Sequence, residues 1–348
     1  MQLSPGKLWG MRRMADASGR FKMTAVDQRP PIKNPIASHY GTKHAPYDDV
    51  ARFKAELIKE LQAQSTAMLL DPHYALPRGI HALSPTKGLI VTLEDSLFQE
   101  TDGGRVSSEI DHWSVEKIKR TGADAVKVLA WYRPDAGKAV LQAQEDFTRR
   151  IGEACVKFDI PFLFELLVYP LAGDADRTTD YVEMTGKKTD HVLASVEQFA
   201  RPEYAIDVFK LESPLNIAAV PGVGNEGWEA AQQAFDEMGA LAGRPWVMLS
   251  AGAGKDEFRN ILSHAFDAGA SGYLAGRAIW QDAFAHFPDW EAIIADLRNE
   301  SVPYMQAVNR LTDEKATPWF EHSCYATKGA SFQPDDASFR KTYTGFGD

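Results

Sequence analysis

The sequence predicts an α/β protein with the (β/α)8 TIM-barrel fold, in which eight parallel strands alternate with helices around a closed sheet. Three observations lead to this expectation. Eight short apolar runs are spread along the 348 residues, helix-length segments separate them, and charged residues stand at or near the ends of seven runs. An open, doubly wound sheet is the alternative, because a single sequence does not show whether the sheet closes.

The composition is that of an ordinary globular protein, with 44% hydrophobic and 25% charged residues and a net charge of −10. The acidic balance argues against a nucleic-acid surface, and no apolar run approaches the roughly 18 residues of a membrane span. The first 20 residues lack the apolar core of a signal peptide. We therefore expect a cytoplasmic protein that acts on a small molecule, without nucleic acid or membrane as partner, and leave open a homo-oligomer.

We expect an N-terminal arm of uncertain order over residues 1–20, a barrel domain over residues 21–319 and a C-terminal tail over residues 320–348. Each strand is an apolar run of the length typical of a buried parallel strand. Pro30-Pro31 end the first strand, and residues 32–47 are expected to form a loop. The eight predicted strands are residues 21–29, 67–72, 88–94, 123–130, 161–168, 206–214, 245–250 and 271–277.

Helices are predicted where apolar residues recur at spacings of three and four, as in Val50, Phe53, Leu57 and Leu61. A polar insertion at 172–190 is expected to form a lid, a subunit contact or a solvated loop. The predicted helices are residues 50–61, 114–120, 140–155, 192–199, 228–243, 258–266, 288–299 and 303–314.

The sixth strand carries a lysine inside an otherwise apolar run. Side chains alternate along a strand, so Val208, Lys210 and Glu212 share one face and Phe209 and Leu211 share the other. A buried lysine is costly unless it is paired or used. The alternatives are a structural ion pair at the strand end and a reactive lysine.

Other strands also end in charged residues, which in a barrel meet at the C-terminal face where active sites lie. One interpretation is a charge network that neutralises itself. The other is a Schiff-base lysine, because burial and a neighbouring cation both move a lysine from its ordinary pKa of about 10.4 towards the range useful for a nucleophile. Glu165, on the strand before Lys210, is the natural proton shuttle. The strand-end residues are Asp27, Asp71, Glu94, Lys127, Glu165, Lys210 and Arg277.

The last two strands end in glycine-containing loops, Ser250-Ala251-Gly252-Ala253-Gly254 and Gly276-Arg277. Glycines let backbone N–H groups approach a phosphate, and the N-terminus of a following helix favours an anion. Tight turns alone are the alternative use of these glycines. The nine histidines show no metal-ligand spacing such as H-E-x-x-H, so we expect no metal site.

Taken together, these residues resemble the class I tagatose-1,6-bisphosphate aldolases and their relatives the sulfofructose-phosphate aldolases. The resemblance covers about residues 21–320, and its motifs are individually weak but specific in combination. The matching segments are Val26-Asp27-Gln28-Arg29, Leu70-Asp71-Pro72, Asp124-Ala125-Val126-Lys127, Phe164-Glu165-Leu166, Val208-Phe209-Lys210-Leu211-Glu212-Ser213-Pro214, Ser250-Ala251-Gly252, Gly276-Arg277 and Ala316-Thr317-Pro318-Trp319.

The resemblance implies a metal-independent barrel enzyme without a cofactor, in which Lys210 is the nucleophile and Glu165 the acid/base. Lys127 and Asp27 are implied to contact substrate hydroxyls. The loops at 250–252 and 276–277 are implied to hold the phosphate of dihydroxyacetone phosphate. The full set of expected substrate-binding residues is Asp27, Gln28, Arg29, Asp71, Lys127, Ser250, Ala251, Gly252, Gly276 and Arg277.

We thus expect an aldolase that cleaves tagatose 1,6-bisphosphate, or a related ketohexose bisphosphate, to dihydroxyacetone phosphate and an aldehyde such as glyceraldehyde 3-phosphate. A 6-deoxy-6-sulfofructose-1-phosphate aldolase, a barrel isomerase or decarboxylase, and a catalytically silent metabolite sensor are the alternatives. Where relatives typically have glycine after the Asp-Gln-Arg run, this chain has Pro30-Pro31. Arg29 and Lys33 beside them either bind a distal anion or are charges at the barrel rim.

Overall fold

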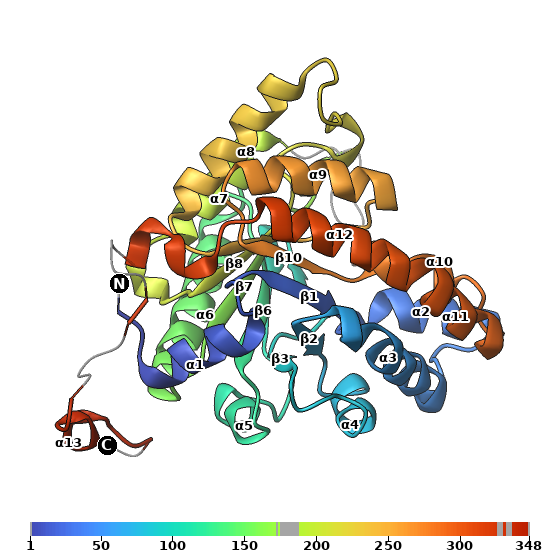
Figure 1. Ribbon diagram of the computed structural model, residues 1–348, viewed down its shortest axis with the longest axis horizontal. Helices are drawn as coiled ribbons and strands as arrows, with labels where there is room; N and C mark the ends of the chain where they lie inside the picture. Colours follow the sequence, from blue (N-terminus) through green and yellow to red (C-terminus); the bar gives the residue numbers. More distant parts are fainter. Residues whose placement is uncertain (1, 172, 175–187, 326–329, 332–335, 347–348) are drawn as a thin grey trace.

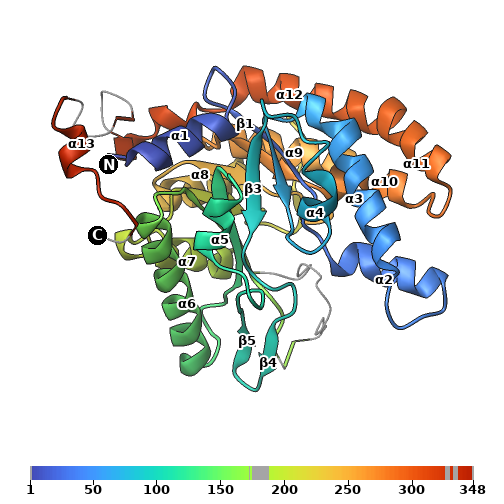
Figure 2. The same cartoon turned by 90° about the horizontal axis from the view of Figure 1, so that it is seen from below.

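Eight parallel strands close into a barrel in the computed structural model, which describes residues 2–171, 173–174, 188–325, 330–331 and 336–346 (Figures 1 and 2). The strand order around the barrel is β1-β10-β9-β8-β7-β6-β3-β2, and β2 pairs with β1 to close it. The prediction of a (β/α)8 barrel is therefore confirmed, and the open sheet is excluded. The barrel strands are β1 (Phe21–Ala25), β2 (Ala67–Leu70), β3 (Gly88–Thr92), β6 (Ala125–Trp131), β7 (Phe162–Leu167), β8 (Val208–Leu211), β9 (Trp246–Met248) and β10 (Gly272–Ala275).

Helices surround the barrel and cover the outer face of the strands (Figure 1). All eight predicted helices are present, although the one expected at 288–299 is shorter and continues through a π-helical turn, Leu297–Ser301, into α12. The α-helices are α1 (Pro5–Met14), α2 (Pro30–His39), α3 (Tyr47–Leu61), α4 (Ala75–Gly79), α5 (Val115–Arg120), α6 (Lys138–Lys157), α7 (Thr189–Phe199), α8 (Trp228–Ala242), α9 (Lys255–Asp267), α10 (Arg277–Phe284), α11 (Trp290–Asp296), α12 (Val302–Lys315) and α13 (Phe339–Thr342).

Apolar side chains form two layers, one inside the barrel and one between the strands and the helices. Val208 packs inside the barrel with inward residues of other strands such as Leu163 and Leu274. Phe209 and Leu211 belong to the outer layer, which the helices cover. The alternation predicted for this strand is confirmed, and it directs Lys210 towards the barrel interior.

The first residues are not an arm of uncertain order, because residues 5–14 form helix α1 at the N-terminal end of the barrel. Met11 and Met14 of this helix are fully buried against the inner layer. Asp159 accepts hydrogen bonds from the backbone N–H groups of Gly6 and Lys7, at 2.8 and 3.1 Å, and so caps the start of the helix. The partner lies about 150 residues away in sequence, which is why no local signal announced the helix.

Residues after the first strand form α2 rather than the expected loop, and Pro30 and Pro31 begin this helix instead of only ending the strand. Proline is tolerated in the first turn of a helix, where its missing N–H has no intrahelical partner and its fixed φ suits the helix. The stiff start places Gln28 and Arg29 immediately before a helix, at the C-terminal end of β1.

A two-stranded hairpin, β4 (Gln99–Thr101) and β5 (Gly104–Val106), was not predicted and lies between β3 and α5, outside the barrel (Figure 2). Most of the polar insertion expected at 172–190 falls outside the described residues. Within the described part of the chain, none of the helices has both the length and the apolarity needed to cross a membrane.

Candidate active site

Charged side chains converge at the C-terminal ends of the strands, which we call the mouth of the barrel. Glu165 and Lys210 are register partners on the neighbouring strands β7 and β8. Lys127 comes from β6, and Asp27 directly follows the β1 region. Because the inward positions below them are apolar, these groups form one polar layer over a dry floor, as the strand-end pattern predicted.

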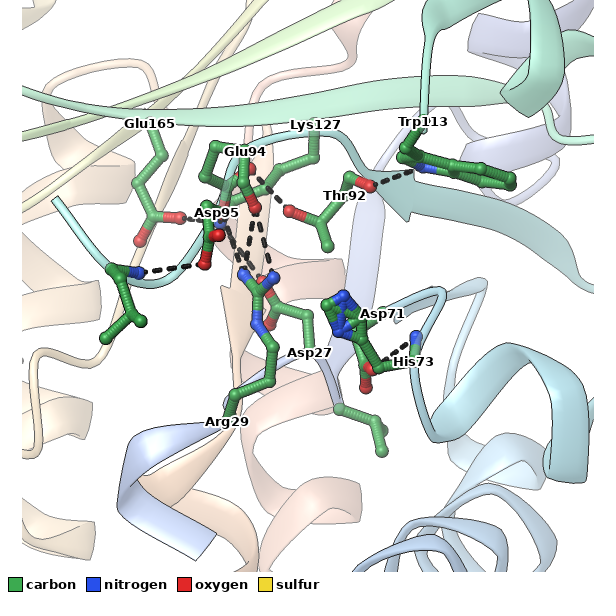
Figure 3. Close-up of polar contacts among 12 residues, drawn as sticks. Asp27, Arg29, Asp71, His73, Thr92, Glu94, Asp95, Trp113, Lys127 and Glu165 are labelled. Carbon is green, nitrogen blue, oxygen red and sulfur yellow. Dashed lines mark hydrogen bonds and ion pairs between the residues drawn. The ribbon is translucent and has the colours of Figure 1, made fainter. Parts of the chain in front are cut away.

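Lys127 lies at the centre of this layer and is completely buried. Its Nζ is 2.6 Å from Oε1 of Glu94, 2.8 Å from Oε2 of Glu165 and 3.1 Å from Oδ2 of Asp27 (Figure 3). An ammonium group carries three N–H donors. Three carboxylates around it therefore match the charged form of this lysine.

Lys210 faces the open side of the same layer. Its Nζ is 2.9 Å from Oε2 of Glu165, so this one carboxylate oxygen lies between the two lysines. Lys210 and Glu165 also line a small pocket that opens at the mouth. The pocket is lined by Asp27, Gln28, Glu165, Lys210, Leu249, Ser250, Ala251, Leu274, Gly276 and Arg277.

The lysines keep the two pocket carboxylates ionised. Burial alone raises the pKa of Asp27, but the charges of Lys127, Lys210 and Arg29 outweigh it and lower the pKa to about 2. For Glu165, burial again raises the pKa, and Lys127 and Lys210 bring it below the ordinary value. Glu165 is thus a carboxylate at neutral pH, ready to accept a proton.

Glu94 belongs to the site although it was absent from our expected site residues. It is buried and contacts Lys127, and its other oxygen accepts a hydrogen bond from the hydroxyl of Thr92. Both terminal nitrogens of Arg29 donate to the backbone oxygen of Glu94 at 3.1 Å (Figure 3). The sequence did mark Glu94 as a strand-end carboxylate, and that was the available signal.

Two expected substrate-binding residues have structural partners instead. Asp71 is completely buried, pairs with Lys54 of α3, and accepts hydrogen bonds from the backbone N–H groups of His73 and Tyr74. Its oxygens are therefore bound within the protein, and it is not among the residues that line the mouth pocket. Arg29 is also buried, and its guanidinium holds Glu94 rather than extending from the rim.

The two glycine-containing loops lie together at one side of the mouth. Ala251 and Gly252 have φ values of +45° and +75°, so the chain turns sharply just after β9, and glycine adopts such a backbone at no steric cost. A Cβ on Gly252 would lie 3.4 Å from Nη1 of Arg277, so the guanidinium packs over this glycine. Ser250 is buried beside them and lines the pocket.

Gln28 and Gly276 are in close contact at the same side. A Cβ on Gly276 would be 2.6 Å from Nε2 of Gln28 and 2.8 Å from the backbone oxygen of Ala25, which explains why glycine stands at 276. The side-chain oxygen of Gln28 is buried and makes no hydrogen bond to any residue that the structure describes. It is an acceptor at the pocket wall that a hydroxyl group could satisfy.

Comparison of the sequence with known proteins shows similarity to aldolases over most of the chain. A family model described as DeoC/LacD family aldolase matches residues 21–282. A tagatose 1,6-diphosphate aldolase of Listeria monocytogenes is 32% identical over 342 residues, which cover 96% of this chain and 97% of the relative. A tagatose 1,6-diphosphate aldolase of Streptococcus pneumoniae is 32% identical over 330 residues, which cover 92% of this chain and 99% of the relative.

Solved structures show the same fold at lower sequence identity. A Schiff-base-forming fructose-1,6-bisphosphate aldolase matches with a TM-score of 0.53 and 17% identity, covering 87% of this chain and 98% of that one. A fructose-bisphosphate aldolase from Plasmodium falciparum matches with a TM-score of 0.63 and 12% identity, covering 91% of this chain and 98% of the other.

Proposed function

The chain belongs to the DeoC/LacD family of aldolases, and on that premise we propose that it is a metal-independent Schiff-base aldolase acting on a phosphorylated ketose. The proposed substrate is tagatose 1,6-bisphosphate or a related ketohexose bisphosphate. The products are dihydroxyacetone phosphate and an aldehyde such as glyceraldehyde 3-phosphate. The full-length relatives named tagatose 1,6-diphosphate aldolase support this choice.

One observation carries the proposal: a single oxygen of Glu165 lies 2.9 Å from Lys210 and 2.8 Å from Lys127, at the wall of the mouth pocket. This arrangement places a nucleophile, a proton acceptor and a fixed cation within one constellation. A lone buried ion pair would need neither the second lysine nor the pocket.

Imine formation begins when Lys210 gives up its ammonium proton, which Glu165 is placed to receive. The free amine adds to the C2 carbonyl of the ketose, a C–N bond forms, and the carbonyl oxygen takes up a proton. Glu165 then returns its proton to this oxygen, which leaves as water, and the protonated imine that remains withdraws electrons from the neighbouring carbon.

Carbon–carbon cleavage follows when the C4 hydroxyl gives its proton to the Glu165 carboxylate. The electron pair of the C3–C4 bond moves towards the imine nitrogen, C4 becomes the carbonyl carbon of the released aldehyde, and an enamine remains on Lys210. Returning a proton to C3 and adding water across the imine then releases dihydroxyacetone phosphate. The buried acceptor of Gln28 and the carboxylate of Asp27 are placed to accept hydrogen bonds from substrate hydroxyls.

The phosphate on C1 is assigned to the loops at the side of the mouth. Arg277 supplies a planar cation, and the missing side chain of Gly252 beside it lets a phosphate approach the backbone N–H groups of this loop. Because C1 is adjacent to C2, a phosphate held here places the ketone carbon near Lys210, which lines the same pocket.

Metal independence is proposed from the charge arrangement. The carboxylates that a divalent ion could use, Asp27, Glu94 and Glu165, all lie within 3.1 Å of the Lys127 ammonium. The positive charge at their centre is already supplied by the protein. An imine nitrogen then takes the electron-withdrawing role that a metal would take in the alternative chemistry.

We propose that the distal anion of the substrate lies in a neighbouring pocket, whose lining includes Arg29, Lys33, His73, Tyr74 and Asp95. Since Arg29 donates both terminal nitrogens to the backbone oxygen of Glu94, Lys33 of α2 is the proposed contact. A sulfonate would suit this pocket as well as a phosphate would, so a sulfofructose phosphate stays the second candidate substrate.

Trapping with borohydride tests the function. The protein is incubated with dihydroxyacetone phosphate, reduced, digested and mapped by mass spectrometry. We expect one adduct on Lys210, its loss in Lys210→Met together with turnover, and full labelling in Lys59→Met, which removes an exposed lysine of α3. An EDTA-treated sample should retain its rate.

Two results would contradict the proposal. Turnover in Lys210→Met would exclude the Schiff base on this residue and favour an isomerase or decarboxylase that uses its lysines electrostatically. A labelled Lys210 without cleavage of any ketose bisphosphate or sulfofructose phosphate would favour the metabolite sensor.

A further inference from the structure

The two lysines of the mouth have unequal surroundings. Lys127 is within ion-pair distance of three carboxylates, whereas Lys210 has one such contact, to Glu165, among the described residues. Glu165 is common to both lysines and cannot distinguish them. Of the remaining two partners of Lys127, Asp27 also lines the pocket, whereas Glu94 does not.

Glu94 is held rigidly behind Lys127, away from the pocket. One carboxylate oxygen lies 2.6 Å from Nζ of Lys127, and the other accepts a hydrogen bond from the Thr92 hydroxyl. Arg29 holds the backbone oxygen with two hydrogen bonds, and its Nη2 is 3.6 Å from the carboxylate. Glu94 is thus held at its backbone oxygen and at its carboxylate, and it is only 2% exposed. Its negative charge therefore stays next to Lys127 and favours the protonated form of that lysine.

We propose that Glu94 is the positioning residue that keeps Lys127 an ammonium ion, so that Lys210 is the lysine of the pair that becomes the nucleophile. The inference rests on the proposed Schiff-base function and adds how the site selects between two lysines. Without Glu94, Lys127 would keep Asp27 and Glu165 but lose its nearest carboxylate, and the difference between the two lysines would be smaller.

The charges that face Lys127 come from four elements. The region after β1 contributes Asp27 and, through Glu94, Arg29; the region after β3 contributes Glu94. Strand β7 contributes Glu165, and β8 contributes Lys210 across Glu165. Three negative charges thus balance three positive ones when both lysines are protonated. When Lys210 becomes neutral, the surplus negative charge surrounds Lys127 and favours its ammonium form further.

Removing the charge of Glu94 should therefore let Lys127 lose its proton at a lower pH. An opposite charge within about 4–6 Å favours the ionised form by about 1–3 pH units, and Glu94 touches Lys127 but not Lys210. Neutral Lys127 would no longer hold Glu165 and Asp27 as carboxylates in their present positions. The alkaline side of the activity profile should report this loss.

The test is the pH profile of kcat/KM for cleavage of the ketose bisphosphate by Glu94→Gln. We expect the alkaline limb of the variant to lie about one pH unit or more below that of the wild type. Relative to the wild type, the variant should lose less kcat/KM at pH values below the limb than at pH values above it. Glu109→Gln is the matched control. Glu109 lies opposite Glu94 in a backbone bridge, but its side chain pairs with Arg150 at the surface, so its limb should stay in the wild-type position.

An alkaline limb of Glu94→Gln that coincides with the wild-type limb would overturn the proposal, and so would a uniform loss of kcat at every pH. If Glu94→Gln does not fold, Glu94→Asp keeps the charge but draws it away from Lys127 by one methylene, and it should move the limb in the same direction by a smaller amount; an unmoved limb overturns the proposal there too. Failure of the proposed function is recognised separately, by the absence of a trapped adduct on Lys210 in the wild type.

Discussion

Four carboxylates close to the mouth have three different roles, and their neighbours decide which. Asp71 is neutralised by Lys54 and caps backbone groups. Glu94 lies behind Lys127, and only Asp27 and Glu165 face the pocket. All four are carboxylates, so their neighbours, rather than their residue type, separate those that are bound within the protein from those that face the pocket.

Replacing Glu165 should remove proton transfer while leaving the pocket shape. We expect Glu165→Gln to lose about 100-fold or more in cleavage, which is the usual contribution of a positioned acid/base, while the Lys210 adduct can still form in part. Single-turnover cleavage and borohydride labelling measure the two steps separately. Glu153→Gln, on the exposed face of α6, is the control. Unchanged single-turnover cleavage would make Glu165 a structural carboxylate.

The lowered pKa of Glu165 also determines whether folding stability rises or falls with pH. A carboxyl group with a lowered pKa in the folded state stabilises the protein above its unfolded pKa, and this contribution disappears as the pH falls through the folded value. The same holds for Asp27, whose pKa is about 2. Both groups therefore add stability at neutral pH that is lost under acid conditions.

Sequence reasoning identified Lys210, Glu165 and Lys127 because strand alternation and strand order are enough to place them together. It did not foresee that Asp71 is paired within the protein, because its partner Lys54 lies on the preceding helix α3 and carries no sequence signal of its own. It left Glu94 out for a related reason. The role of this residue depends on its distance to Lys127, and a strand-end position does not give a distance.

At the scale of elements, the loop after β9 and the start of α10 act as one unit, because Arg277 packs over Gly252. The sequence predicted that both glycine-containing loops lie at the strand ends, but it did not predict that Arg277 contacts Gly252. Helix α2 was missed for the opposite reason. Two prolines read locally as a break, whereas in the structure they occupy the first turn of a helix.

Arg277→Ala should weaken binding of dihydroxyacetone phosphate much more than binding of unphosphorylated dihydroxyacetone. A hydrogen bond to a charged group contributes about 1.5–3 kcal/mol, which corresponds to roughly ten- to a hundred-fold in the dissociation constant. Calorimetry with both ligands measures the difference, and Arg259→Ala on the exposed face of α9 is the control. An equal loss for both ligands would place the phosphate elsewhere.

At the scale of the whole molecule, a barrel was predicted from the count and spacing of the apolar runs, whereas its closure depends on the long-range pairing of the first strand with the last, β1 with β10. A buried ion pair helps hold helix α3 to this sheet. Lys54 contacts Asp71 after β2 and donates to the backbone oxygen of Val26 after β1, at 2.8 Å.

Lys54→Met should leave Asp71 as an uncompensated buried charge, and we expect a loss of about 3–5 kcal/mol in the free energy of unfolding. Urea titration followed by circular dichroism measures it. Lys59→Met on the same helix should change little, because Lys59 is exposed and its ion pairs lie at the surface. In the double variant Lys54→Met/Asp71→Asn, part of the loss should be recovered. A single variant as stable as the wild type would show that this ion pair is dispensable.

Helix α1, which covers the N-terminal end of the barrel, has a practical consequence for handling the protein. Its segment is joined to the C-terminal part of the chain, since Trp319 donates to the backbone oxygen of Gly19 and Leu3 donates to that of Ser331. Helices α1 and α13, the first and last helices described, accordingly lie on the same side of the molecule (Figure 1). An affinity handle or a solid support attached on this side would therefore leave the opposite end of the barrel, which carries the candidate site, facing free solution.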